Sequence, residues 1–192
     1  MSQDFQWCHD ELKKRGWDPD SECSLIALID QGSYFFGIWA ATILLRDIGT
    51  AACIPALKKA LYYPKTDIQI TSLWTISMIA GAAERDLYLA MLLDTNYSHK
   101  MTAIFCVAEY CGEEAVDAVS NRVKKLLPAK RSRIAWNREQ TELTRAVSFI
   151  VRFPSRPKVE SALQHVIQRW SLLETVEKEH LRKLDFFANV TS

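Results

Sequence analysis

The sequence predicts an all-α protein, a right-handed α-solenoid of about four helical hairpins with capping helices at both ends. Two observations support this prediction. From Ser33 onward, apolar residues recur at spacings of three and four, which is the pattern of amphipathic helices. Glycines 49, 81 and 112 follow apolar helix ends at intervals of 32 and 31 residues, and a second helical segment follows each of them. A period near 30 with two helices per unit is typical of α-solenoids.

Length and composition set the class of protein. The chain has 192 residues, which favours a single domain. With 48% hydrophobic and 24% charged residues, the composition excludes a wholly disordered chain. No apolar run reaches the ~18 residues of a membrane span, and the polar first residues do not resemble a signal peptide. Five irregularly spaced cysteines indicate reduced thiols, so we expect a cytoplasmic protein.

The first part of the chain is predicted to contain a cap and the first repeat. Residues 1–32 form the N-terminal cap, with one or two short helices and a break at Asp18-Pro19-Asp20. Residues 34–49 form an apolar helix. The next helix has Pro55 in its first turn, where a missing N–H costs nothing, and it stops at Pro64.

Two further repeats follow, so that residues 33–127 hold three repeats in all. A capping box of Thr66 and Gln69 is predicted to start the helix that ends at Gly81. A second helix follows it, and another pair surrounds Gly112 and ends before Pro128. Each repeat glycine is expected to close its helix in the left-handed conformation.

The first helix of each repeat is apolar on most sides, and the second is more polar. A buried layer between repeats is therefore predicted, made of Trp39, Ile43, Leu73, Trp74, Ile76, Ile104, Phe105 and Val107. Residues 128–192 are predicted to be an irregular repeat, with a helix over about 138–153, followed by a C-terminal cap. Terminal repeats differ from the others because they cover the ends of the core.

The segment RDIGTAACIPALKKAL and the later SMIAG resemble the short bacterial HEAT-like repeats, also called phycobilisome-lyase-type HEAT repeats. The resemblance covers about residues 34–127. The second and third repeats depart from it, because they lack the proline of Ile54-Pro55-Ala56-Leu57. The resemblance implies a curved stack whose second helices line a concave surface. It implies no single activity, because one scaffold serves many functions.

Charge is unevenly distributed along the chain. The formal charge is −7 over residues 1–120 and +8 over residues 121–192. Residues 121–158 contain 11 Lys and Arg but only two Glu, with Trp136 among them. Such a segment suits nucleic acid, whereas a sequence pI of about 7.6 is below the value above 9 typical of nucleic-acid-binding domains.

Motifs of catalysis are missing from the sequence. It contains no GxSxG, P-loop or GxGxxG, and its four histidines are scattered. The run Cys8-His9-Asp10-Glu11 holds metal-ligand types, but adjacent helical residues face different directions. We therefore expect no enzyme activity, no metal and no cofactor.

The function predicted is binding of another protein through the concave second-helix face. An immunity protein that neutralises a bacterial toxin is one form of this function. The alternatives are a nucleic-acid-binding protein of the HEAT-like DNA glycosylase type and a bilin lyase or chaperone-like adaptor. No membrane and no small-molecule substrate are predicted. The expected binding residues are Lys58, Lys59, Tyr62, Arg85, Tyr88, Asp117, Asn121, Lys124, Lys125 and Arg131.

Overall fold

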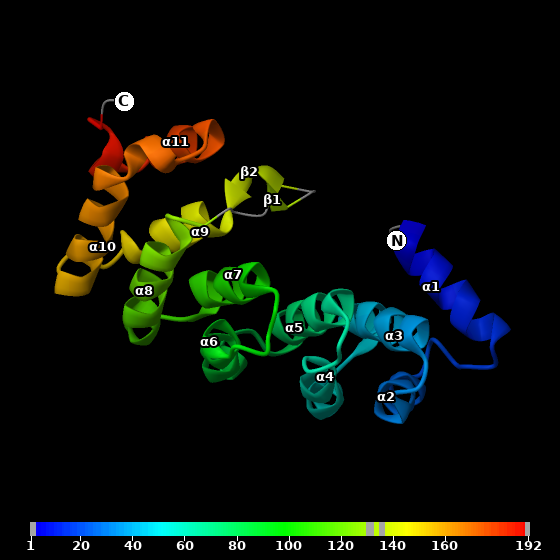
Figure 1. The fold of residues 1–192 in the computed structure, drawn as a ribbon. Helices are drawn as coiled ribbons and strands as arrows, with labels where there is room; N and C mark the ends of the chain where they lie inside the picture. Colours follow the sequence, from blue (N-terminus) through cyan, green and yellow to red (C-terminus); the bar gives the residue numbers. More distant parts are fainter. Residues whose placement is uncertain (1–2, 130–132, 135–136, 191–192) are drawn as a thin grey trace. The chain divides into compact units, whose positions relative to one another are not determined.

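The computed structural model describes residues 3–129, 133–134 and 137–190, and these form an all-α protein with one short antiparallel pair of strands (Figure 1). The predicted fold class is confirmed at this level. Within the described residues, no helix is both long and apolar enough to span a bilayer. The helices are α1 Gln3–Lys14, α2 Glu22–Gln31, α3 Phe35–Ile48, α4 Ile54–Ala60, α5 Thr66–Ala80, α6 Arg85–Leu93, α7 Lys100–Tyr110, α8 Val116–Leu126, α9 Glu142–Ile150, α10 Pro157–Gln168 and α11 Thr175–Leu181, and the strands are β1 Arg133–Ile134 and β2 Asn137–Thr141.

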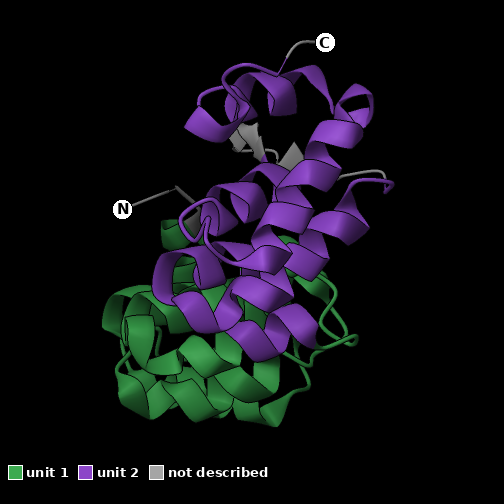
Figure 2. Ribbon diagram, turned by 90° about the vertical axis from the view of Figure 1, so that its left-hand side faces the viewer, with its two compact units in different colours: residues 1–88, 94–102 green, residues 89–93, 103–192 purple. Residues whose placement is uncertain are grey.

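The chain divides into two compact units (Figure 2). Unit 1 comprises Met1–Tyr88 and Asp94–Thr102, and unit 2 comprises Leu89–Leu93 and Ala103–Ser192. The division passes through α6 and α7, inside the predicted repeats. The two units are therefore described separately.

Unit 1 is organised around α3, which packs against α1, α2 and α5 (Figure 1). The helices α2 and α4 also contact each other, and α4 packs on α5. We call α1, α3 and α5 the first helices and α2 and α4 the second helices of successive pairs. First helices thus contact first helices, and second helices contact second helices. Each short helix gains cover for its apolar side only from these neighbours, since one hairpin cannot bury both of its faces alone.

Three buried threonines join α3 to α5. The hydroxyls of Thr42 and Thr71 share a hydrogen bond of 2.6 Å, although the residues are 29 positions apart. The hydroxyl of Thr75 donates to the carbonyl oxygen of Thr42 at 2.7 Å. Each of these two hydroxyls also lies within hydrogen-bond distance of a carbonyl oxygen of its own helix, so the hydroxyl that accepts across the seam donates to that carbonyl. The polar groups in this seam are therefore satisfied, which makes their burial tolerable.

The glycine turns differ from the prediction. Of the three repeat glycines, Gly81 has a positive φ of 50°, whereas Gly49 and Gly112 have φ of −70° and −107°. The left-handed helix closure predicted for these glycines is found at none of the three, since Gly81 combines its positive φ with a ψ of −130°. Gly49 is required for another reason, because a Cβ there would lie 2.4 Å from the carbonyl oxygen of Leu45. Pro55 lies in the first turn of α4 as predicted, but the helix ends at Ala60, four residues before Pro64, where it was predicted to stop.

The predicted capping box at Thr66 was also wrong. Thr66 is the first residue of α5, and Lys65 precedes it without a side-chain cap. Gln69 instead links two other segments: its amide nitrogen donates to the carbonyl of Tyr63 at 3.0 Å, and its amide oxygen accepts from the Ser98 hydroxyl at 2.8 Å. The glutamine thereby ties the turn before α5 to the segment before α7.

Unit 2 is built from α8 packed on α9 and α10, with α11 against α9 and β2. The helix predicted over 138–153 begins later, at Glu142, because Asn137–Thr141 is extended. Thr141 caps α9 in a reciprocal box with Thr144, and its hydroxyl donates to the buried Glu177 carboxylate at 2.8 Å. This bond anchors α11 to the start of α9.

The threonine seam leads to a stability prediction. Thr75→Val should lower the free energy of unfolding of the full chain by about 1 kcal/mol, because a buried hydrogen bond is lost while the side-chain shape is kept. Urea denaturation measures the change. The exposed Thr95 provides the control, and Thr95→Val should stay within about 0.5 kcal/mol of the parent. Equal effects of the two substitutions would contradict a structural role for the seam.

Candidate functional site

The predicted binding lysines of unit 1 lie on α4, and both are paired with neighbouring carboxylates. The ammonium of Lys58 lies 2.7 Å from the Glu84 carboxylate, and that of Lys59 lies 2.6 Å from Asp30 on α2. Their exposed positions make each pair worth under about 1 kcal/mol. These two lysines therefore contribute to contacts between neighbouring elements, and a partner would have to compete for them.

The remaining predicted residues of unit 1 differ in exposure. Tyr62 is 58% exposed just after α4, and the side chain of Arg85 is 61% exposed at the start of α6. Tyr88 has no exposed surface, and its hydroxyl donates to the carbonyl of Gly81 at 2.8 Å. The prediction that Tyr88 binds a partner was wrong, because the ring fills the core of its repeat.

The predicted residues of unit 2 lie on α8. Asp117 pairs with Lys158 of α10, and the Lys124 ammonium donates to Ser161 of the same helix at 2.9 Å. Asn121 and Lys125 are exposed. Arg131 lies outside the described residues, as do Lys130 and Trp136. The predicted set is thus divided between two units, and much of its charge is paired between neighbouring helices.

The first helices of unit 1 expose more aromatic surface than expected. Of the residues predicted to form a buried layer, Ile43, Leu73, Ile76, Ile104 and Val107 are buried. Trp39 and Trp74 are instead half-buried, as is Phe105 in unit 2, so the prediction was wrong for the three aromatic residues. At these positions the neighbouring helices bury aliphatic and threonine side chains but leave part of each ring in solvent.

The threonine seam fixes where these tryptophans lie. Trp39 is three residues before Thr42, and Trp74 is three residues after Thr71, so each shares a helix face with the threonine that meets the other helix. The opposite sides of α3 and α5 pack on α2 and α4. The two tryptophans therefore lie on the seam-facing sides of α3 and α5, and each keeps part of its ring exposed. Met78, one turn beyond Trp74, is 55% exposed.

Helix α1 extends this surface with another tryptophan. Cys8 and Leu12 are fully buried where α1 packs on α3, which leaves Trp7 on the outside, 53% exposed. The ring of Trp7 meets Phe36 edge to face, with centroids 4.8 Å apart, and lies 6.3 Å from Trp39. We call this set of residues the first-helix face: Trp7, Phe36, Trp39, Trp74 and Met78.

An arginine stands at the end of the first-helix face. Arg46 is one turn after Thr42 on α3, and its Nε has no hydrogen-bond partner among the described residues. Burial lowers the pKa of its guanidinium, although Asp47 and Cys8 act in the opposite direction. An arginine remains charged in proteins, so this buried Nε–H is a donor without an acceptor among the described residues.

Two histidines, His9 and His180, lie beside side chains that could take part in metal binding or catalysis. His9 lies 3.1 Å from the Asp20 carboxylate, while its neighbour Cys8 is buried. Within the described part of the chain, no three His, Cys, Asp or Glu residues gather as a metal-binding group. In unit 2 the Ser148 hydroxyl lies 3.2 Å from Nε2 of His180, at a small pocket of about 100 Å³. Such a pair alone does not define a catalytic site, which also needs a group that stabilises the developing charge.

The burial of Tyr88 gives a prediction. Tyr88→Ala should lower the free energy of unfolding by about 3–5 kcal/mol, because a large cavity is left in the core. Tyr88→Phe should cost about 1–2 kcal/mol, since only the bond to Gly81 is lost. Chemical denaturation of the full chain measures both. Tyr62→Ala, at an exposed site, is the control and should change stability by less than about 0.5 kcal/mol. A Tyr88→Ala protein of parental stability would refute the core assignment.

A second prediction concerns the thiols. Burial, and then the Glu22 carboxylate, raise the pKa of Cys53 to about 11, and its Sγ lies 3.1 Å from the carbonyl oxygen of Thr50. Because the thiolate is the reactive form, Cys53 should resist iodoacetamide at pH 8, with about one thiol in a thousand ionised. The exposed Cys23 should react first. Peptide mapping after brief alkylation distinguishes them, and early labelling of Cys53 would contradict its described environment.

Comparisons with models of known protein families, with curated proteins and with solved structures found no significant match to this chain. The HEAT-like resemblance therefore stays a prediction. The candidate site rests on the geometry of the first-helix face.

Proposed function

We propose that the chain is a protein-binding module, and that it binds its partner through the first-helix face of unit 1. The observation that carries the proposal is the exposure of Trp7 and Met78, each more than half accessible, together with the partly exposed Trp39 and Trp74. Grouped exposed apolar side chains of this size mark interaction surfaces more often than ordinary protein surface.

The composition of the face supports the same function. Protein interfaces are enriched in aromatic residues, Met and Arg, and are depleted in Lys, Glu and Asp at their centres. The first-helix face contains three tryptophans and a methionine, with Arg46 at its end. Tryptophan and arginine also dominate the residues that contribute most to binding energy.

The binding residues predicted on the second helices contribute to packing between neighbouring elements. Lys58, Lys59, Asp117 and Lys124 already have partners in neighbouring elements of their own units. Breaking such a pair to bind another molecule returns little energy. We therefore assign the binding surface to the first helices and not to the second helices that the sequence predicted.

We also propose that the helical pairs continue as a right-handed α-solenoid of HEAT-like repeats. Support comes from side-chain contacts inside each unit that join residues about one repeat apart. In unit 1 they join Asp30 to Lys59, 29 residues on, and Thr42 to Thr75, 33 residues on. In unit 2 Ser148 meets His180, 32 residues on. Repeats of this kind present extended surfaces to partners.

A paired affinity capture tests the function. The immobilised full chain is compared with Trp7→Ala and Met78→Ala, using native lysate treated with nuclease at low and high salt. We expect a defined protein to be retained by the parent. Each substitution should weaken its capture about tenfold or more, because truncating a central interface residue costs over ~1 kcal/mol.

Tyr62→Ala is the matched control, since it removes an equally exposed aromatic ring outside the first-helix face. It should leave capture unchanged. Loss of capture with Tyr62→Ala but not with Trp7→Ala would restore the second-helix face. Recovery that disappears with nuclease and falls steeply with salt would favour the nucleic-acid function instead. The toxin, bilin and adaptor forms of the function stay predictions.

A further inference from the structure

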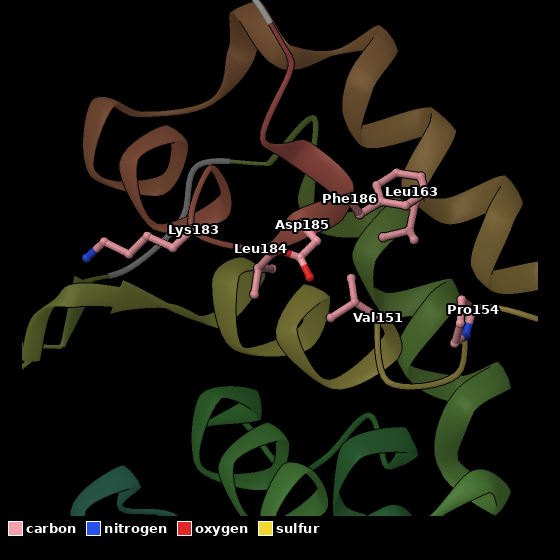
Figure 3. Close-up of a pocket in the computed structure, with 7 residues that line it drawn as sticks. All are labelled: Val151, Pro154, Leu163, Lys183, Leu184, Asp185 and Phe186. Atoms are coloured by element: carbon pink, nitrogen blue, oxygen red, sulfur yellow. The ribbon is translucent and has the colours of Figure 1, made fainter.

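Unit 2 contains a pocket that the protein-binding function does not use (Figure 3). It has a volume of about 570 Å³ and lies between the end of α9, helix α10 and the segment that follows α11. This volume is within the range of roughly 300–1,000 Å³ found for small-molecule sites. The lining residues are Val151, Pro154, Leu163, Lys183, Leu184, Asp185 and Phe186.

The walls of the pocket are largely apolar. Leu163 is buried at its base, with 1% of its surface exposed, whereas Phe186 is 40% exposed at its edge. The ring of Phe186 meets Phe187 edge to face, with centroids 5.0 Å apart, and Phe187 in turn stacks on Trp170 at 5.8 Å. Phe186 is therefore held in place by packed aromatic rings, which stabilise this wall of the pocket.

The two charged residues of the pocket are placed differently. Figure 3 shows the carboxylate of Asp185 directed toward Val151, between the apolar walls, while the Lys183 side chain extends away from them. The charge presented to an occupant is consequently negative. A negative group beside apolar walls complements a cation attached to an apolar chain.

We propose that this pocket binds a small aliphatic amine, with the alkyl chain against Val151, Leu163 and Phe186 and the ammonium beside Asp185. An amine of this kind is protonated at neutral pH, as a lysine side chain is. The apolar chain supplies most of the affinity, because each methylene taken from water adds to the hydrophobic free energy. The Asp185 carboxylate makes the pocket select a positively charged ligand over a neutral or negative one.

The test is a titration of the full chain with butylamine, hexylamine and octylamine below their micelle concentrations, followed by NMR of labelled Val and Leu methyl groups. Shifts are expected at Val151, Leu163 and Leu184. Affinity should rise about two- to fourfold per methylene across the series. Hexylamine should bind roughly fivefold more tightly than hexanoate, with hexan-1-ol between them.

Variants of the lining residues separate the contribution of charge to amine binding from the contribution of the apolar walls. Asp185→Asn should remove the preference for hexylamine over hexan-1-ol and keep the dependence on chain length. Lys183→Gln, the matched control, should leave the preference for the amine in place. Phe186→Ala should weaken all three amines and reduce the gain per methylene. Circular dichroism confirms that each variant is folded.

Three results would overturn the proposal. Affinity that does not depend on chain length would show that the apolar walls do not bind the ligand. Hexanoate bound more tightly than hexylamine, with the preference lost in Lys183→Gln, would assign the pocket to anions. An affinity that does not increase beyond butylamine would indicate a site for an ammonium on four methylenes. A lysine side chain has this structure, so the pocket would then be assigned to a protein segment. None of these results bears on the first-helix face, which lies in unit 1.

Discussion

Lateral burial between short helices is the constraint on which this structure depends. Helices of 7 to 15 residues are marginal in isolation, so α3, α4 and α5 persist because their neighbours cover their apolar sides. The threonine seam between α3 and α5 shows the cost of this arrangement. Polar groups enter the contact, and Thr42, Thr71 and Thr75 satisfy one another and the helical carbonyls. A buried hydroxyl without such a partner would oppose the packing that the helices require.

The same constraint leaves one side of each first helix uncovered. In unit 1, α3 and α5 meet each other on one side and pack on second helices on another. Trp39, Trp74 and Met78 lie on the same helix faces as the seam threonines, and α1 adds Trp7. The second helices also have an outer side, but there the charged residues pair between neighbours. Exposed apolar side chains occur beside the second helices too, at Tyr62 and Leu93, so the assignment of the binding surface depends on the aromatic group formed by Trp7, Phe36 and Trp39.

Much of the fold follows from local sequence patterns, while the site depends on three-dimensional context. The helix from Phe35 to Ile48, and Pro55 in the first turn of α4, follow from periodicity and proline geometry. The pattern could not distinguish a tryptophan inside a layer from one at its edge, because both are apolar and recur at helical spacing. Tyr88 was mistaken for a surface residue for the converse reason: its hydroxyl finds a carbonyl inside the core, at Gly81. The strand at Asn137–Thr141 was missed because it pairs with β1 and is tied to α11 by the bond from Thr141 to Glu177, 36 residues away, neither of which a local pattern reveals.

Hydroxyl-radical footprinting of the chain, free and bound to its captured protein, tests the central claim most directly, since it reads Trp, Met and Tyr oxidation at single residues. The account predicts that binding reduces the oxidation of Trp7, Trp74 and Met78 and leaves that of Tyr62 unchanged. Protection of Tyr62 with unchanged oxidation of Trp7 and Met78 would contradict it and would assign binding to the second helices.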